Sequence, residues 1–141
     1  MNVIFADSVY WIAITNPRDQ WHETALAARE RRSDADLVTT EDVLTEVLTY
    51  FGAYGPDVRR TAARIVRTIL DDSEVDVIPH TSGTFMEGLA LYESRLDKTY
   101  SMVDCMSMVI MRDRDIREAL TNDDHFAQEG FIVLLGDNRA G

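Results

Sequence analysis

The sequence is poor in cysteine, lysine and proline, and it has no long hydrophobic run. Its single cysteine, Cys105, cannot form an internal disulfide, which fits a reducing compartment such as the cytoplasm. No apolar run approaches the roughly 20 residues that a membrane-spanning helix needs. The N-terminal residues lack the basic start and the longer apolar stretch of a signal peptide. Because there is no repeat and no Gly/Pro-rich linker, we expect one domain, residues 1–141, in the cytoplasm and without a membrane partner.

Positive charge is scarce as well. The 14 lysines and arginines face 25 aspartates and glutamates, so the net charge is -11. Taken alone, this balance argues against nucleic acid as a partner, because contacts to phosphate normally dominate that affinity. It favours instead an acidic site that holds metal, a basic partner, or no more than solubility.

Short apolar segments alternate with helical patterns along the chain. Strands are predicted at residues 3–6, 37–39, 75–78, 119–121 and 132–135. Helices are predicted at residues 9–14, 19–32, 39–51, 57–72 and 82–96, and from residue 101 onward. Strands that alternate with helices in this way predict an α/β fold with a parallel sheet and right-handed crossovers.

The helix that begins at Ser101 is the organising element of the sequence. Ser101 and Asp104 form a capping-box pattern, and residues 102–111 are apolar nearly all round, which is typical of a helix buried in the centre of a domain. Asp104 therefore lies in the first turn of a buried helix, where an unpaired carboxylate is costly. The helix dipole offsets part of that cost, and a metal ion would offset more. Asp104 either only caps the helix or belongs to a metal site.

Glu46 lies on or beside an apolar helical face. A second capping box, Thr39 and Asp42, opens the helix predicted over residues 39–51. Positions 43, 46, 47, 50 and 51 follow the spacing of one face, so the Glu46 carboxylate is either at the border of the face, in water, or turned into a site.

Two other predicted helices each have side chains of one kind on one face. Arg60, Arg64 and Arg67 recur on one side of the helix over residues 57–72, either as a solvated face or as contacts for phosphate. The helix over residues 82–96 is predicted to turn four large side chains inward: Phe85, Met86, Leu89 and Tyr92.

Two more carboxylates follow strands. Asp7 comes directly after the first predicted strand and Asp123 just after the fourth, each at the start of a helix that it would also cap. Ligands of open α/β sheets bind outside the carboxyl ends of the strands, where the strand order reverses. If the sheet reverses at its centre, Asp7, Glu46, Asp104 and Asp123 converge on one edge.

Such a cluster needs a cation, because four neighbouring carboxylates cannot all remain ionised without one. Hard oxygen ligands without Cys or His spacing favour Mg²⁺ or Mn²⁺ over zinc. A site of this kind suits phosphodiester hydrolysis, in which metal ions activate water and neutralise charge on the phosphate. The ions would also supply the positive potential that the chain itself lacks.

Four segments together resemble the PIN-domain ribonucleases, especially the VapC-type toxins of bacterial toxin–antitoxin pairs. They are residues 3–8 (VIFADS), 39–47 (TTEDVLTEV), 97–105 (DKTYSMVDC) and 119–126 (ALTNDDHF), with Gly130 and Phe131 following. The resemblance spans nearly the whole chain, and the last two segments are its most specific part. It implies a PIN-like α/β fold with a five-stranded parallel sheet flanked by helices.

The same resemblance implies roles for the acidic residues. Asp7, Glu46, Asp104 and Asp123 match the catalytic acidic quartet of the family. Asp7 and Asp104 would be the principal metal ligands, and Glu46 and Asp123 would complete the site through waters or a second ion. Ser101 and Thr121 would support these ligands through their hydroxyl groups, and Asp124 is an alternative to Asp123.

The predicted function is that of a metal-dependent endoribonuclease of a type II toxin–antitoxin system. An in-line attack by a metal-activated water would leave 5′-phosphate and 3′-hydroxyl ends. By the resemblance the protein would be a homodimer, neutralised by an antitoxin whose tail blocks the acidic cleft, and Arg60, Arg64 and Arg67 would guide the RNA. One alternative is a catalytically silent PIN fold that binds RNA or protein. Another is a phosphate-monoester hydrolase or phospho-acceptor receiver of the doubly wound class, with Asp7 as nucleophile. It needs a lysine near the site after a later strand, whereas Lys98, the only lysine, lies just before the central helix.

Overall fold

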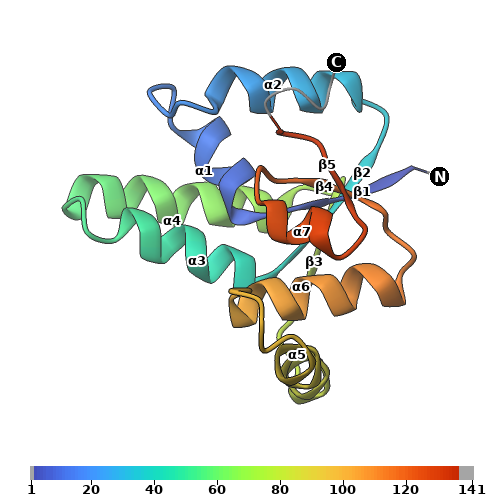
Figure 1. The fold of residues 1–141 in the computed structure, drawn as a ribbon. Coiled ribbons are helices and arrows are strands. Elements are labelled where there is room, and N and C mark those ends of the chain that lie inside the picture. Colours follow the sequence, from blue (N-terminus) through green and yellow to red (C-terminus); the bar gives the residue numbers. More distant parts are fainter. Residues whose placement is uncertain (1, 137–141) are drawn as a thin grey trace.

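Five parallel strands form the centre of the protein in a computed structural model that describes residues 2–136 (Figure 1). The strands are β1 (Val3–Ala6), β2 (Asp36–Thr40), β3 (Val75–Ile78), β4 (Glu118–Leu120) and β5 (Ile132–Val133). The helices are α1 (Ser8–Thr15), α2 (His22–Arg31), α3 (Glu41–Phe51), α4 (Pro56–Asp71), α5 (Ser82–Ser94), α6 (Met102–Asp113) and α7 (Asp124–Gln128). The predicted α/β fold with a five-stranded parallel sheet is confirmed.

The strand order β3-β2-β1-β4-β5 puts β1 in the middle of the sheet. The chain adds β2 and β3 on one side of β1 and then crosses over to add β4 and β5 on the other. In the register, Phe5 of β1 lies beside Val38 of β2 and Ala119 of β4. The strand order therefore reverses at β1 and β4, the arrangement on which the predicted convergence of carboxylates depends.

The core of the sheet consists of strand residues buried on both faces. Ile4, Phe5 and Ala6 of β1 and Ala119 and Leu120 of β4 are fully buried. Such continuous apolar runs are typical of parallel strands that are covered by helices on both sides.

The predicted central helix is present as α6. Most of its residues from Asp104 to Met111 are buried. Both bonds of the predicted capping box form: the Asp104 backbone N–H donates to Ser101 Oγ (3.0 Å), and the Ser101 backbone N–H donates to Asp104 Oδ2 (3.1 Å). This cap fixes the Asp104 carboxylate at the first turn of the helix.

The predicted cap of α3 was wrong by one residue. Thr40, not Thr39, is the N-cap, and its Oγ1 accepts a hydrogen bond from the Val43 backbone N–H (3.0 Å). Thr39 belongs to β2, where its buried hydroxyl donates to the Ala6 carbonyl (2.8 Å) and accepts from Trp11 Nε1 (3.2 Å). Strand β2 is one residue longer at each end than the predicted strand 37–39, because Asp36 pairs with Val3 of β1 and Thr40 pairs with Ile78 of β3.

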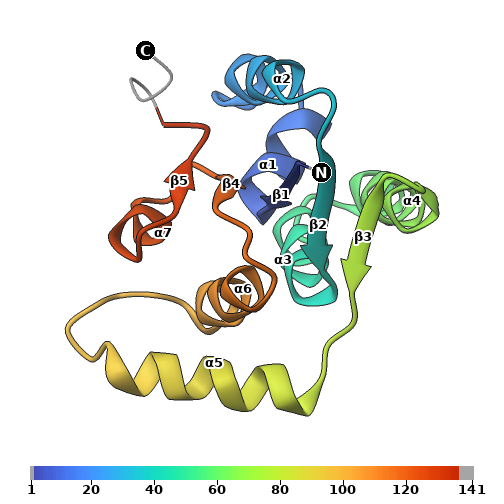
Figure 2. The same cartoon turned by 90° about the vertical axis from the view of Figure 1, so that its right-hand side faces the viewer.

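The predicted inward face of α5 was wrong for three of its four residues. Phe85, Met86 and Tyr92 are 42%, 59% and 47% exposed, and Leu89 is half-buried. The buried residues of the helix are Gly88 and Leu91. Helix α5 lies outermost and packs mainly on α6 (Figure 2). A Cβ atom added to Gly88 would lie 2.6 Å from Met106 Cγ. The close contact between the two helices therefore uses the glycine side of α5, and the large side chains point elsewhere.

This contact gives a stability prediction. We expect Gly88→Ala to lower the free energy of unfolding by about 1–2 kcal/mol, because overpacking against Met106 outweighs the gain in helix propensity. Gly83→Ala is the matched control: in the same helix its Cβ would meet only Thr81 Oγ1, at 3.8 Å. Urea unfolding followed by circular dichroism measures both variants. Equal or higher stability of Gly88→Ala would contradict the packing described here.

Candidate functional site

The candidate site lies at the carboxyl ends of β1 and β4, where the strand order reverses. Asp7 directly follows β1, and Thr121 and Asp123 follow β4. Glu46 reaches the same region from α3, and Asp104 from the first turn of α6. A crevice at this point is where ligands of open α/β sheets bind.

Thr121 connects two of the acidic residues. Its hydroxyl donates to Asp7 Oδ2 (2.9 Å) and accepts a hydrogen bond from the Asp123 backbone N–H (3.1 Å). Thr121 is fully buried and Asp7 is only 4% exposed. The hydroxyl therefore fixes the orientation of the Asp7 carboxylate and the start of the segment that carries Asp123.

Asp7 has the most perturbed carboxyl group of the site. Burial, followed by the negative charges of Asp104 and Glu46, raises its pKa to about 7, although hydrogen bonds from the Ser8 backbone and from Thr121 act in the opposite direction. At neutral pH, without a cation, the neutral and ionised forms of Asp7 are therefore close in free energy. A bound cation would favour the ionised form.

The pKa values of Glu46 and Asp104 are raised as well. Burial, and then the charges of Asp104, Asp123 and Asp42, raise the pKa of Glu46, opposed by a hydrogen bond from the Ser8 side chain. Burial and the charge of Asp123 raise the pKa of Asp104, opposed by hydrogen bonds from the Ser101 backbone and from His125. The structure thus brings all four predicted acidic residues within electrostatic reach of one another.

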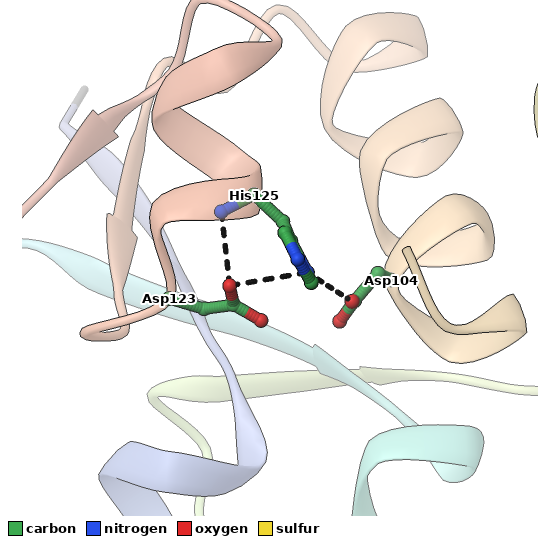
Figure 3. Close-up of side chains that lie close together, drawn as sticks. All are labelled: Asp104, Asp123 and His125. Carbon is green, nitrogen blue, oxygen red and sulfur yellow. Dashed lines mark hydrogen bonds and ion pairs between the residues drawn. The ribbon is translucent and has the colours of Figure 1, made fainter. Parts of the chain in front are cut away.

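Asp104 and Asp123 share a third neighbour, His125 (Figure 3). Its Nδ1 atom lies 3.2 Å from Asp104 Oδ2 and 3.2 Å from Asp123 Oδ1. One atom from each of the three side chains lies within 4.8 Å of the others, so the three residues form a compact cluster. Asp123 Oδ1 also accepts a hydrogen bond from the His125 backbone N–H (2.9 Å) at the start of α7.

Sequence reasoning missed His125 as a member of the site. Its only signal was its place in the segment between Asp123 and Phe126, and its contact with Asp104 depends on how α7 packs against α6. Asp123 is the residue whose carboxylate meets Asp104, while Asp124 is exposed in the first turn of α7.

The arginine face lies apart from this cluster. Arg60, Arg64 and Arg67 are exposed on α4, and α3 separates α4 from α6 (Figures 1 and 2). Arg60 pairs with Asp57 of its own helix (2.9 Å). Contact of these arginines with RNA stays a prediction.

The donor set of the cluster suits a hard divalent cation. Carboxylate oxygens dominate it, which fits Mg²⁺ or Mn²⁺ better than a soft metal. Burial first, and then the neighbouring carboxylates, raise the pKa values of Asp7, Glu46 and Asp104, so the ionised forms are unfavourable. A bound cation would favour these ionised forms.

Comparison with known proteins agrees with this geometry. Residues 4–131 match the family model of the PIN domain. The 23S rRNA-specific endonuclease VapC20 of Mycobacterium tuberculosis, from strains CDC 1551 / Oshkosh and H37Rv, is 28% identical over 133 residues, which cover 94% of this chain and 98% of that protein.

Solved structures show the same fold. The crystal structure of Mycobacterium tuberculosis VapC20, a sarcin-ricin loop cleaving toxin, has a TM-score of 0.81 at 26% identity and covers 92% of this chain and 96% of that one. VapBC2 from Rickettsia felis, bound to a DNA fragment from its promoter, has a TM-score of 0.66 at 11% identity, with coverage of 93% and 96%.

Among the residues that the structure describes, no helix is both long and apolar enough to span a membrane.

The raised pKa of Asp7 gives a pH prediction. Because folding raises this pKa from 3.8 to about 7, the stabilisation from the neutral form is complete below about pH 3.8 and is lost as the pH rises through 7. In EDTA, the free energy of unfolding of the wild type should therefore fall relative to that of Asp7→Asn between pH 5 and pH 7. The expected slope is roughly 1.4 kcal/mol per pH unit. Urea unfolding at several pH values measures it, and parallel curves for the two proteins would contradict the assignment.

Proposed function

This chain belongs to the PIN domain family, and we propose that it is a metal-dependent endoribonuclease that hydrolyses RNA phosphodiester bonds. The observation that carries the proposal is the convergence of Asp7, Glu46, Asp104 and Asp123 at the point where the strand order reverses. Three of these carboxyl groups have raised pKa values, and Asp123 shares the neighbour His125 with Asp104. Carboxylates gathered in this way favour a bound divalent cation, Mg²⁺ or Mn²⁺. Phosphodiester hydrolysis is a reaction that such a site supports.

The acidic residues would divide the work. Asp7 and Asp104 are the proposed direct ligands, because they are the most buried of the four. The Thr121 hydroxyl donates a hydrogen bond to the Asp7 carboxylate, and the Ser101 backbone N–H donates one to the Asp104 carboxylate. Glu46 and Asp123 would complete the site through waters or a second ion. When bound, the ion supplies positive charge and a water of lowered pKa beside the phosphate. The residues of the chain bind and orient it, and the products would carry 5′-phosphate and 3′-hydroxyl ends.

The substrate and partners follow from the relatives as proposals. We propose that the protein is the toxin of a type II toxin–antitoxin system, acts in the cytoplasm, and cleaves a structured ribosomal RNA loop, as the name of VapC20 indicates for that protein. A homodimer and a cognate antitoxin are the proposed protein partners. Exposed Tyr50 and Tyr54 near the turn between α3 and α4, and exposed Phe85 and Met86 on α5, support contact with other proteins.

Neither alternative function has equal support. A PIN fold that binds without cutting would have no need for four clustered carboxylates, and this chain keeps them all. A reaction that uses Asp7 as a nucleophile needs a lysine beside it, whereas Lys98 lies in the loop before α6, where it pairs with Asp97 (3.8 Å).

Asp104→Asn tests the proposed activity. We expect it to lower RNA cleavage by roughly 100-fold or more while the protein stays folded, because the amide can still accept the hydrogen bond of the α6 cap but carries no charge for a cation. Cleavage of a sarcin-ricin loop oligonucleotide in Mg²⁺ or Mn²⁺, and its loss in EDTA, provides the measurement. Asp97→Asn, at an exposed carboxylate before α6, is the matched control. Cleavage by Asp104→Asn at the wild-type rate would refute the proposal.

The arginine face has a test of its own. If Arg60, Arg64 and Arg67 contact RNA phosphates, replacing all three by glutamine should weaken RNA binding and reduce the slope of log affinity against log salt by about 0.7 for each lost contact to a single strand. Binding is measured by fluorescence anisotropy with the Asp104→Asn protein, which leaves the RNA intact. Arg117→Gln, at the exposed residue directly before β4, is the control. Unchanged affinity and salt slope would show that the arginines are only a solvated face.

A further inference from the structure

We propose that Glu129 and Tyr100 are positioning residues that act through His125 to hold Asp104 and Asp123 in the arrangement that the divalent-ion site requires. The inference rests on the proposed function, because it concerns the metal site of that reaction. It adds Glu129 and Tyr100 to the site and gives His125 a role, and none of the three belongs to the acidic quartet.

Glu129 is a fixed anion at the end of α7. Its side chain is 5% exposed and pairs with Arg95 (Nε to Oε2, 2.7 Å) from the loop before α6 and with Arg112 (Nη2 to Oε1, 2.7 Å) from the last turn of α6. Hydrogen bonds from Arg95, Arg112 and Tyr100 lower the pKa of Glu129 to about 2. Glu129 therefore joins α6, α7 and the loop between α5 and α6.

Tyr100 connects Glu129 to His125. Its hydroxyl donates to Glu129 Oε2 (2.8 Å), and its buried ring lies 5.1 Å from the His125 ring, centroid to centroid, at an angle of 56°. The preceding residue, Thr99, places its Oγ1 3.0 Å from His125 Nε2. Two consecutive residues of one loop thus contact the imidazole, Tyr100 at the ring and Thr99 at Nε2.

The inner nitrogen of the ring points to the two carboxylates (Figure 3). His125 Nδ1 lies 3.2 Å from both Asp104 Oδ2 and Asp123 Oδ1. Ionised carboxylates only accept hydrogen bonds, so the Nδ1 atom that faces them carries the hydrogen. The Nδ1–H group of His125 lies between the carboxylates of Asp104 and Asp123, so its attraction to both opposes their mutual repulsion.

A role in positioning differs from a role in stability alone by its effect on metal affinity. Partners that orient the ligands of a metal typically change metal affinity or activity by 10–100-fold when they are removed. A residue that only stabilises the fold would change the unfolding transition and leave the dissociation constant for the metal unchanged. The affinity of the folded protein for Mn²⁺ alone is therefore the informative measurement.

The first experiment compares His125→Ala with His125→Asn by calorimetric titration of Mn²⁺. We expect alanine to weaken Mn²⁺ binding by about 10–100-fold. Asparagine keeps an N–H donor near the Nδ1 position and should recover most of that loss. Equal affinity of His125→Ala and the wild type would overturn the proposal. So would ¹⁴N modulation in the electron spin echo of bound Mn²⁺, because it would make His125 a direct ligand.

A double-mutant cycle tests the path from Glu129. Tyr100→Phe keeps the ring contact and removes the hydrogen bond to Glu129, so it should weaken Mn²⁺ binding in the wild type and have no further effect in His125→Ala. Glu129→Gln should behave in the same way. Tyr100→Phe without effect on Mn²⁺ affinity, or with the same effect in both backgrounds, would overturn the role of Tyr100.

Controls separate this inference from the proposed function. Circular dichroism of the metal-free variants establishes that each is folded before titration. If the wild type takes up no Mn²⁺ and cuts no RNA, the proposed function fails together with this inference. If the wild type binds Mn²⁺ and cleaves while His125→Ala matches it in both, only the inference fails.

Discussion

Burial of several carboxylates close to one another at the centre of the molecule is the constraint on which the rest of the site depends. Burial first, and then the charges of Asp104 and Glu46, raise the pKa of Asp7 to about 7, so its ionised form is unfavourable. Thr121, Ser101 and His125 supply hydrogen bonds that offset part of this free energy but leave the carboxyl pKa values raised. A divalent cation, the proposed partner of this site, would remove the remainder and so link metal binding to the stability of the site.

The topology of the sheet creates this crowding. Asp7 and Thr121 are 114 positions apart in sequence, yet they form a hydrogen bond because β1 and β4 are neighbours in the sheet. Asp104 and Asp123 cap α6 and α7 and also lie in the acidic cluster. The two interpretations of Asp104 that the sequence left open, a helix cap or a site residue, are therefore compatible: the cap holds the carboxylate in place where the cluster forms.

Local signals predicted the fold well, and tertiary contacts account for the errors. The capping box of Ser101 and Asp104 is complete within four residues, so the sequence alone located α6. Thr39 was mistaken for a cap because nothing local distinguishes it from Thr40. Its place in β2 depends on tertiary contacts, namely its pairing with Val77 of β3 and its hydrogen bond to the Ala6 carbonyl. The buried face of α5 was predicted wrongly because α5 packs on α6 through Gly88, which leaves Phe85 and Met86 exposed. His125 gave no periodic signal, and its contact with Asp104 spans 21 positions.

The central claim is that Asp7 and Asp104 bind one divalent cation at the carboxyl edge of the sheet. A crystal of the protein grown with Mn²⁺, with diffraction recorded at the manganese absorption edge, tests it directly. The account predicts an anomalous peak within about 2.0–2.3 Å of carboxylate oxygens of both residues. A peak elsewhere, or no peak in crystals where the two carboxylates are ordered, would contradict it.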